Sequence, residues 1–302
     1  MEIIKSISQQ SIGTAVAVGY FDGVHLGHRA VIGSAAQAAG QLGVKSTVLS
    51  FDMSAFRAQG KGKSDLMPPH ERERVLEGMG IDILALPDFQ GVMGMTCEEF
   101  VQRVLIGWLG ARSVSCGGDF RFGKNRAGGA DTLRELCGER GIELKIVPDV
   151  MLNGEPVSTT RIKSAIESGD VALAGALLGR PYGLELPVVS GQHLGTRLGF
   201  ATINQRFPQD IVQPRYGVYG ARIIIDGREY RGITNIGVRP TVSNSGSAVM
   251  ETHIFDFDGD LYGRNATVEL MFFLRDERRF ASAAELRAQV LADCETVRNA
   301  EF

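Results

Sequence analysis

Short apolar runs alternate with segments of helical spacing through the first half of the chain. The first run is apolar almost throughout, as is typical of a strand buried on both faces of a sheet, and the last run alternates. The runs lie at 14–19, 44–51, 81–87, 113–118 and 142–148. Because helical segments separate them, the pattern predicts βαβ units, a parallel sheet and helices on both of its faces. Ligands of such sheets bind beyond the carboxyl ends of the strands.

The helical segments between these strands have recognisable ends. One segment ends at Gly80, and another begins at Thr96, a favourable N-cap residue. Glu98 and Glu99 follow in the first turn, where the helix dipole favours acidic side chains. A later segment, 161–178, is predicted to form two short helices broken at Gly169-Asp170.

The pattern changes near residue 180. Alternating runs separated by Gly- and Asp-rich turns predict strands within 184–191, 217–237, 248–257 and 265–275. Asp226-Gly227 between two β-rich runs predicts a hairpin, and Ser282 is a candidate N-cap for a closing helix. We therefore expect an α/β domain with a doubly wound parallel sheet at 1–180, and a small β-barrel domain with a terminal helix at 181–302.

Composition narrows the classes of function. The net charge of −3 gives no electrostatic argument for a nucleic-acid or membrane-surface partner. The four cysteines form no CxxC pair, which argues against a zinc site and a disulfide framework. No signal-peptide pattern is visible, and no apolar run approaches the ~18 residues of a membrane span. We expect a cytoplasmic protein that holds any anionic ligand locally.

Two histidines follow the first strand at a strand-to-helix turn. Imidazoles at His25 and His28 can hydrogen-bond phosphate oxygens beside the positive end of the next helix. Gly27 between them lets a phosphate approach the backbone closely. The same spacing also suits a helix cap, a metal pair or surface residues, so the pair alone names no reaction.

Three further segments could bind or react. The loop 117–129 combines glycines with three cations, and could hold phosphates or be a flexible polar loop. The segment 157–165 places hydroxyls before a helix, where they can cap it or leave N–H groups for an anion. Glu251 stands in a β-like run, as a general base or as a solvent-facing residue, and His253 would share its strand face.

Eight motifs agree in order and spacing with one family. They are "GYFDGVHLGHRAVI", "GGDFRFGKNRAGG", "VSTTRIK", "LLGRPYGL", "LGFATIN", "GVYG", "NIGVRPT" and "ETHIFDFDGDLYG". On these motifs the chain resembles the bacterial bifunctional riboflavin kinase / FAD synthetase (FMN adenylyltransferase) family over essentially its whole length. Because the motifs fall in register across both predicted domains, the resemblance is specific.

The resemblance implies an N-terminal module of nucleotidyltransferase type that converts FMN and ATP to FAD and pyrophosphate. His25 and His28 would contact the ATP phosphates as charge builds in the transition state. The other residues implied on the ATP side are Gly19, Phe21, Gly27, Ser158, Thr159 and Arg161. Those implied on the flavin side are Asp119 and Phe120.

The resemblance also implies a C-terminal kinase module that converts riboflavin and ATP to FMN and ADP. Glu251 would be the general base toward the ribityl hydroxyl. Thr202 and Asn204 would help to place Mg²⁺ and ATP phosphate, with Gly195 also on the ATP side. The residues implied near the flavin are Asn235, Gly237 and Arg239. The expected partners are the small molecules riboflavin, FMN and ATP, and Mg²⁺ is the expected cofactor of both reactions.

The chain departs from the family pattern at a few positions. Ala201 replaces a proline of the Pro-Thr-Ala-Asn signature, and Thr196 replaces an arginine just before it. The turn at 50–56 lacks the family's prolines and histidine, and Tyr20 replaces an asparagine. Two alternatives therefore stand beside the bifunctional enzyme. One is an enzyme with an impaired module, either the flavin side of the adenylyltransferase or a slowed kinase. The other is a non-catalytic flavin- or nucleotide-binding regulator.

Overall fold

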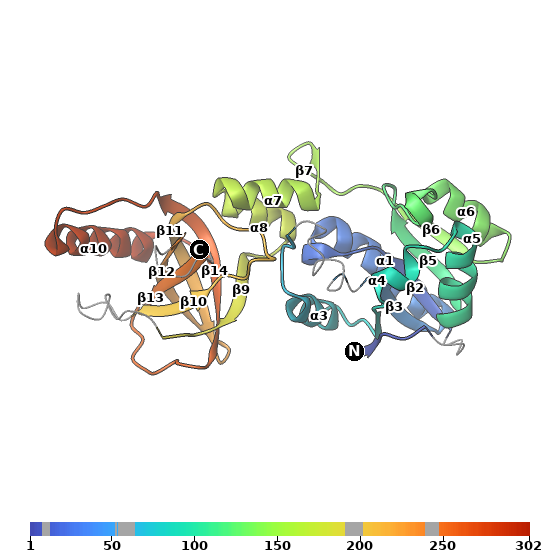
Figure 1. The fold of residues 1–302 in the computed structure, drawn as a ribbon, viewed down its shortest axis with the longest axis horizontal. Helices are drawn as coiled ribbons and strands as arrows, with labels where there is room; N and C mark the ends of the chain where they lie inside the picture. Colours follow the sequence, from blue (N-terminus) through green and yellow to red (C-terminus); the bar gives the residue numbers. More distant parts are fainter. Residues whose placement is uncertain (8–12, 52, 54–63, 191–201, 239–247) are drawn as a thin grey trace. The chain divides into compact units, whose positions relative to one another are not determined.

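The computed structural model describes residues 1–7, 13–51, 53, 64–190, 202–238 and 248–302 (Figure 1). The chain forms two compact units. The first contains Met1–Lys63 and Pro69–Ser158, and the second contains Ser64–Pro68 and Thr159–Phe302.

The first unit is built on a parallel sheet with the strand order β1-β4-β3-β2-β5-β6. The strands are β1 (Glu2–Ile4), β2 (Thr14–Val18), β3 (Lys45–Leu49), β4 (Ile83–Ala85), β5 (Ala111–Gly117) and β6 (Glu143–Val147). The chain winds outward from β2 to β3 and β4, then crosses to β5 and β6 on the other side. The carboxyl ends of β2 and β5 therefore lie at the topological switch point, where doubly wound sheets bind their ligands.

Helices cover both faces of this sheet. On one face, Ala38 and Ala39 of α1 (Leu26–Leu42) pack against Ala15 of β2. On the other, Val16 and Val18 join a larger core with side chains from η2 (Phe100–Trp108) and α6 (Ala130–Gly138). The remaining helical segments are η1 (Asp22–Val24), α3 (Pro69–Gly78), α4 (Phe89–Val92), α5 (Cys97–Glu99) and η3 (Lys124–Arg126), and β7 (Met151–Leu152) pairs with β8 (Glu155–Pro156).

The second unit is an antiparallel sheet with the order β10-β13-β12-β11-β14-β9. Its strands are β9 (Tyr182–Pro187), β10 (Thr202–Arg206), β11 (Gly217–Ile225), β12 (Arg228–Val238), β13 (Ala248–Ile254) and β14 (Asn265–Arg275). The two ends of this order approach each other, because the Val189 N–H donates to the Asn204 carbonyl at 2.8 Å. The sheet therefore curls into a small barrel. Inside it, the Thr252 hydroxyl donates to the Thr234 hydroxyl at 2.8 Å.

Helices α7 (Thr159–Ser168), α8 (Val171–Leu178) and α10 (Ala283–Asn299) complete the second unit (Figure 1). The predicted break between the first two is confirmed, because Asp170 caps α8 by accepting from the Leu173 N–H at 3.0 Å. The Ser282 hydroxyl caps α10 through the Glu285 N–H at 3.1 Å, also as predicted. The Asp226-Gly227 hairpin joins β11 to β12 with φ values of 50° and 77°.

The fold class predicted from the sequence is confirmed, with two corrections. The first sheet has a sixth strand, β1, which pairs in parallel with β4. Three partly exposed residues at a sheet edge leave no pattern that could have predicted it. Thr96 begins its helix with a full capping box shared with Glu99, but the helix then continues with π-helical rather than α-helical winding over Phe100–Trp108.

Substitution of one buried and one exposed leucine of the first unit tests where its core lies. Leu133 is 0% exposed within the core, and Leu42, at the end of α1, is 47% exposed. We expect Leu133→Ala to lower the free energy of unfolding of this unit by about 2–5 kcal/mol, because it leaves a cavity. The matched change Leu42→Ala should cost well under that. Urea unfolding followed in both variants checks this, and equal losses would contradict the described core.

Candidate active sites

The first candidate site is the corner between β2 and α1. The chain leaves β2 through two residues with left-handed backbone, Phe21 (φ 56°) and Val24 (φ 43°). Such a φ is costly for a β-branched valine, and strain of this kind concentrates at functional sites. His25 then becomes the N-cap of α1, because its Nδ1 accepts the His28 N–H at 3.2 Å.

The two predicted histidines form one stacked pair. Their ring centroids are 3.5 Å apart with an interplanar angle of 18°, and Phe21 meets the His28 ring edge-on at 5.3 Å. A side chain would be crowded at two glycines beside them. A Cβ on Gly27 would lie 3.2 Å from the His25 ring, and a Cβ on Gly19 would lie 2.9 Å from the Phe21 ring.

The electrostatics favour a neutral His28 ring. Burial, and after it the neighbouring His25, hold the pKa of His28 well below its usual value of 6.5, although a hydrogen bond with the Asp22 backbone acts in the opposite direction. His28 is therefore a neutral imidazole at neutral pH, and its buried Nδ1 has no hydrogen-bond partner among the described residues. The pair stands at the positive end of α1, which adds to the attraction for an anion.

The loop after β5 lies beside this corner, because β5 pairs directly with β2. It carries Asp119, which is exposed, and Phe120, which is half-buried and stacks on Phe122 with centroids 5.6 Å apart. Phe122 and Gly128 exchange two backbone hydrogen bonds of 3.1 and 3.0 Å, which close the loop. The structure thus brings the predicted flavin-side residues to the same edge of the sheet as the histidines.

The first residues of the segment 157–165, which carries the predicted hydroxyls, also lie at this corner. The Val157 carbonyl lies 3.6 Å from the position that a Cβ on Gly27 would take, and Ser158 follows it directly. Thr159 and Arg161 belong to the first turn of α7, in the second unit.

The second candidate site is on the barrel. Three polar residues form one row across neighbouring strands, because Glu251 of β13 is paired with Asn204 of β10 on one side and Asn235 of β12 on the other. The next row on the same face holds Thr202 and His253. A cavity of about 330 Å³ opens over these rows. Its lining consists of Thr202, Val218, Ile233, Asn235, Glu251, His253, Arg275, Glu277, Arg278, Phe280, Leu286, Val290 and Asp293.

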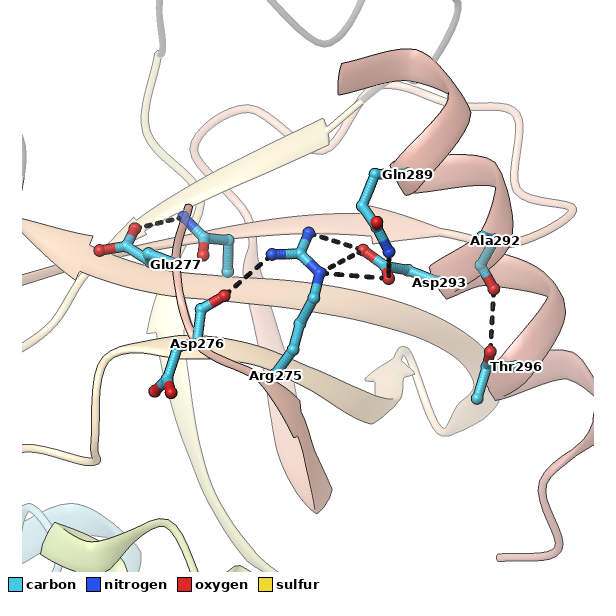
Figure 2. A network of polar contacts seen from close by, with 8 residues as sticks. Arg275, Asp276, Glu277, Gln289, Ala292, Asp293 and Thr296 are labelled. Atoms are coloured by element: carbon cyan, nitrogen blue, oxygen red, sulfur yellow. Dashed lines mark hydrogen bonds and ion pairs between the residues drawn. The ribbon is translucent and has the colours of Figure 1, made fainter. Parts of the chain in front are cut away.

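The wall of this cavity opposite the sheet is fixed by a partly buried ion pair (Figure 2). Arg275, at the end of β14, donates to both carboxylate oxygens of Asp293 on α10 at 2.7–3.2 Å. Asp293 is 3% exposed and also accepts from Gln289 at 2.7 Å. A paired, hydrogen-bonded charge of this kind holds α10 in one position relative to the sheet.

Glu277 connects the segment after β14 to the predicted flavin side. Its carboxylate accepts from the Asn235 amide at 3.0 Å. The same carboxylate lies 2.2 Å from the position that a Cβ on Gly237 would take, so a side chain there would displace the end of Glu277.

Sequence reasoning did not identify this wall of the cavity. One signal was available for Asp293, because it shares an apolar stripe of α10 with Val290 and Val297. An acidic residue on such a stripe indicates a buried partner. Arg275 ends a strand and Glu277 follows it, and neither residue gave such a signal. Gly195 and Arg239, both predicted site residues, lie outside the described residues, as do Thr196, Ala201 and most of the turn at 50–56.

Within the described part of the chain, no helix is long and apolar enough to cross a membrane. The same residues contain no cluster of three or more His, Cys, Asp or Glu side chains that could hold a metal ion.

The chain thus joins a histidine-bearing corner at the switch point of a doubly wound sheet to a barrel with a carboxylate in its cavity. Together with the family matches below, these features place it among two-domain nucleotide-dependent transferases. Family models agree unit by unit: FAD synthetase matches residues 7–161 and riboflavin kinase matches residues 178–301. The chain belongs to the bifunctional riboflavin kinase/FMN adenylyltransferase family.

Relatives match over nearly the whole chain. The bifunctional riboflavin kinase/FMN adenylyltransferase of Pseudomonas fluorescens is 36% identical, covering 98% of this chain and 95% of its own length. The proteins of the same name from Bacillus subtilis and Escherichia coli K12 are each 32% identical, covering 95% and 99% of this chain. A crystal structure described as a macrolide-efflux protein from Streptococcus pneumoniae is 32% identical, with a TM-score of 0.88 and full coverage of both chains.

The stacked histidines make a prediction about titration. We expect His28 in the ligand-free protein to take up a proton only below pH 6.5, because burial and His25 both oppose its charge. Since the unfolded chain binds that proton first, this residue also makes stability fall as the pH drops below 6.5. In His25→Gln, the pKa of His28 should rise. NMR titration of the imidazole signals checks both statements, and a His28 pKa at or above 6.5 would contradict them.

Proposed function

We propose that the two sites carry out two consecutive reactions. The barrel site transfers the terminal phosphoryl group of ATP to riboflavin, giving FMN and ADP. The corner site transfers the adenylyl group of ATP to FMN, giving FAD and pyrophosphate. The proposal rests mainly on the two family matches, which together cover nearly the whole chain. Each match lies over a unit that contains the predicted polar residues, the stacked histidines in the first and the Glu251 row in the second. We assign the adenylyltransferase to residues 1–180 and the kinase to 181–302.

In the adenylyltransferase, an oxygen of the FMN phosphate attacks the α-phosphorus of ATP. The bond from the α-phosphorus to the bridging oxygen breaks, and pyrophosphate leaves with that oxygen. The enzyme's contribution is to position the two phosphates and to stabilise charge. His25 and His28 donate N–H groups to ATP phosphate oxygens, while Ser158, Thr159 and Arg161 hold the departing pyrophosphate. Asp119 and Phe120 border the flavin.

In the kinase, Glu251 accepts the proton of the terminal ribityl hydroxyl as that oxygen attacks the γ-phosphorus. Its neighbours in the row, Asn204 and Asn235, are amides and do not compete for the proton. The cavity supplies apolar contacts for the flavin ring from Val218 and Ile233 on the sheet and Leu286 on α10. Asn235, Gly237 and Arg239 are assigned to the flavin side.

The kinase residues fit a magnesium ion. Thr202 lines the cavity and Asn204 is 5% exposed, and both come from β10. A hydroxyl and an amide carbonyl are hard oxygen donors, and Mg²⁺ is commonly held by few protein oxygens together with substrate phosphates and water. When bound there, the ion would neutralise charge on the ATP phosphates. Gly195 is assigned to the ATP side as well.

The proposed partners are the small molecules riboflavin, FMN and ATP. The alternatives of an impaired module or a non-catalytic regulator gain no support from the described site residues or from the relatives. Glu251, in particular, has no use in a protein that only binds flavin.

A substitution at the proposed general base tests the kinase. Glu251→Gln keeps the size of the side chain but cannot accept the proton, so FMN formation from riboflavin should fall about 10²–10⁴-fold. FAD formation from supplied FMN should be unchanged. The matched control is Glu229→Gln, an exposed position on the neighbouring strand β12. Chromatography of the flavins measures both rates, and loss of both activities in a folded Glu251→Gln protein would refute the assignment of one site to each unit.

The complementary substitution is made at the corner. His28→Asn removes the imidazole donor, so FAD formation from FMN should fall about 10²–10³-fold, as for other lost transition-state donors. Riboflavin phosphorylation should be retained. His70→Asn, an exposed histidine of the same unit, is the control. Unchanged FAD formation in His28→Asn would mean that this imidazole does not serve the reaction.

A further inference from the structure

A buried cation in the first unit has no role in the account above. Arg72 is the fourth residue of α3 and is 7% exposed. One guanidinium nitrogen, Nη1, donates to the Tyr20 carbonyl at 3.2 Å and to the Ser50 hydroxyl at 3.3 Å. Its Nε is buried and has no hydrogen-bond partner, and Arg72 makes no ion pair within the described residues.

A structural role alone does not account for this arrangement. The Ser50 hydroxyl already donates to the Tyr20 carbonyl at 2.7 Å, so the two strand ends are joined without Arg72. A buried charge without a counter-charge is costly, whereas a neutral side chain of similar volume would not be. Among the described residues no carboxylate forms an ion pair with Arg72, so an anionic ligand that supplies a counter-charge would lower this cost.

The position of Arg72 points to a substrate of the corner site. Ser50 follows β3 directly and Tyr20 lies just beyond β2, and these two strands are parallel neighbours. The guanidinium carbon is 5.6 Å from the centre of the Tyr20 ring, and α3 packs against η1, which leads into His25. The cation therefore stands at the same carboxyl edge of the sheet as the histidines, on the β3 side.

We propose that Arg72 binds a phosphate oxygen of a substrate at the adenylyltransferase site. The inference rests on the proposed function, in which a phosphate monoester and a triphosphate must meet at this corner. A guanidinium matches phosphate geometry and stays protonated, so it can hold the attacking phosphate without taking a proton from it. Because the histidines face the ATP side, FMN is the substrate expected at Arg72.

The test compares Arg72→Met and Arg72→Lys with the control Arg74→Met, an exposed arginine of the same helix. FAD formation is measured with FMN and ATP varied separately. We expect KM for FMN to rise at least about tenfold in Arg72→Met. In Arg72→Lys it should recover in part, because lysine restores the positive charge but lacks the planar guanidinium that binds phosphate through two N–H groups. KM for ATP and riboflavin phosphorylation should stay unchanged, and Arg74→Met should behave as wild type.

The outcomes separate the sources of the phosphate. A rise in KM for FMN assigns Arg72 to the flavin phosphate, and a rise in KM for ATP alone assigns it to the nucleotide. Unchanged KM values with only a lower melting temperature would overturn the proposal. If Arg72→Met fails to fold, inorganic phosphate serves as the probe: it should compete with FMN in wild type and more weakly in Arg72→Lys, and equal inhibition would overturn the proposal.

Failure of the proposed function looks different. In that case the wild-type protein would form no FAD from supplied FMN. Wild-type FAD formation together with unaltered KM values in both Arg72 variants would instead remove only the role of Arg72.

Discussion

The first site depends on one hydrogen bond, from the His28 backbone N–H to the His25 imidazole. It uses His25 as the cap of α1 and so fixes the ring at the positive end of the helix. The cap and His28 are three residues apart, so their side chains meet on one helix face and their rings stack. Burial and the nearby His25 ring keep His28 neutral. Gly27 and the left-handed Phe21 follow from the same constraint. The geometry that ends a strand and starts a helix thus also forms the proposed phosphate site.

The second site depends on cross-strand pairing instead. Register places Glu251 between two amides, and a partly buried Arg275–Asp293 pair holds α10 over the same face of the sheet. The Asp293 carboxylate accepts hydrogen bonds from both Arg275 and Gln289. In the proposed function, Glu251 is the reacting acid of the cavity and Asp293 is the structural one.

The sequence predicts what is encoded locally. Buried strands, caps and the Asp226-Gly227 hairpin each depend on a few consecutive residues, and the two histidines are three positions apart. The contacts that border the barrel cavity could not be predicted in the same way. Arg275 and Asp293 of α10 are 18 positions apart, and Asn235 and Glu277 are 42 positions apart. The strand β1 was missed since its three edge residues have no alternation to detect. Arg72 was missed because a charged residue on a short polar helix normally faces solvent.

The central claim is that two separate sites in one chain work in sequence through FMN. It is tested most directly by mixing two single-site variants, Glu251→Gln and His28→Asn, with riboflavin, ATP and Mg²⁺. The account predicts that neither variant alone forms appreciable FAD from riboflavin, but that the mixture does, because FMN released by one is used by the other. A mixture that forms no FAD, although each variant retains its own half-reaction, would contradict it.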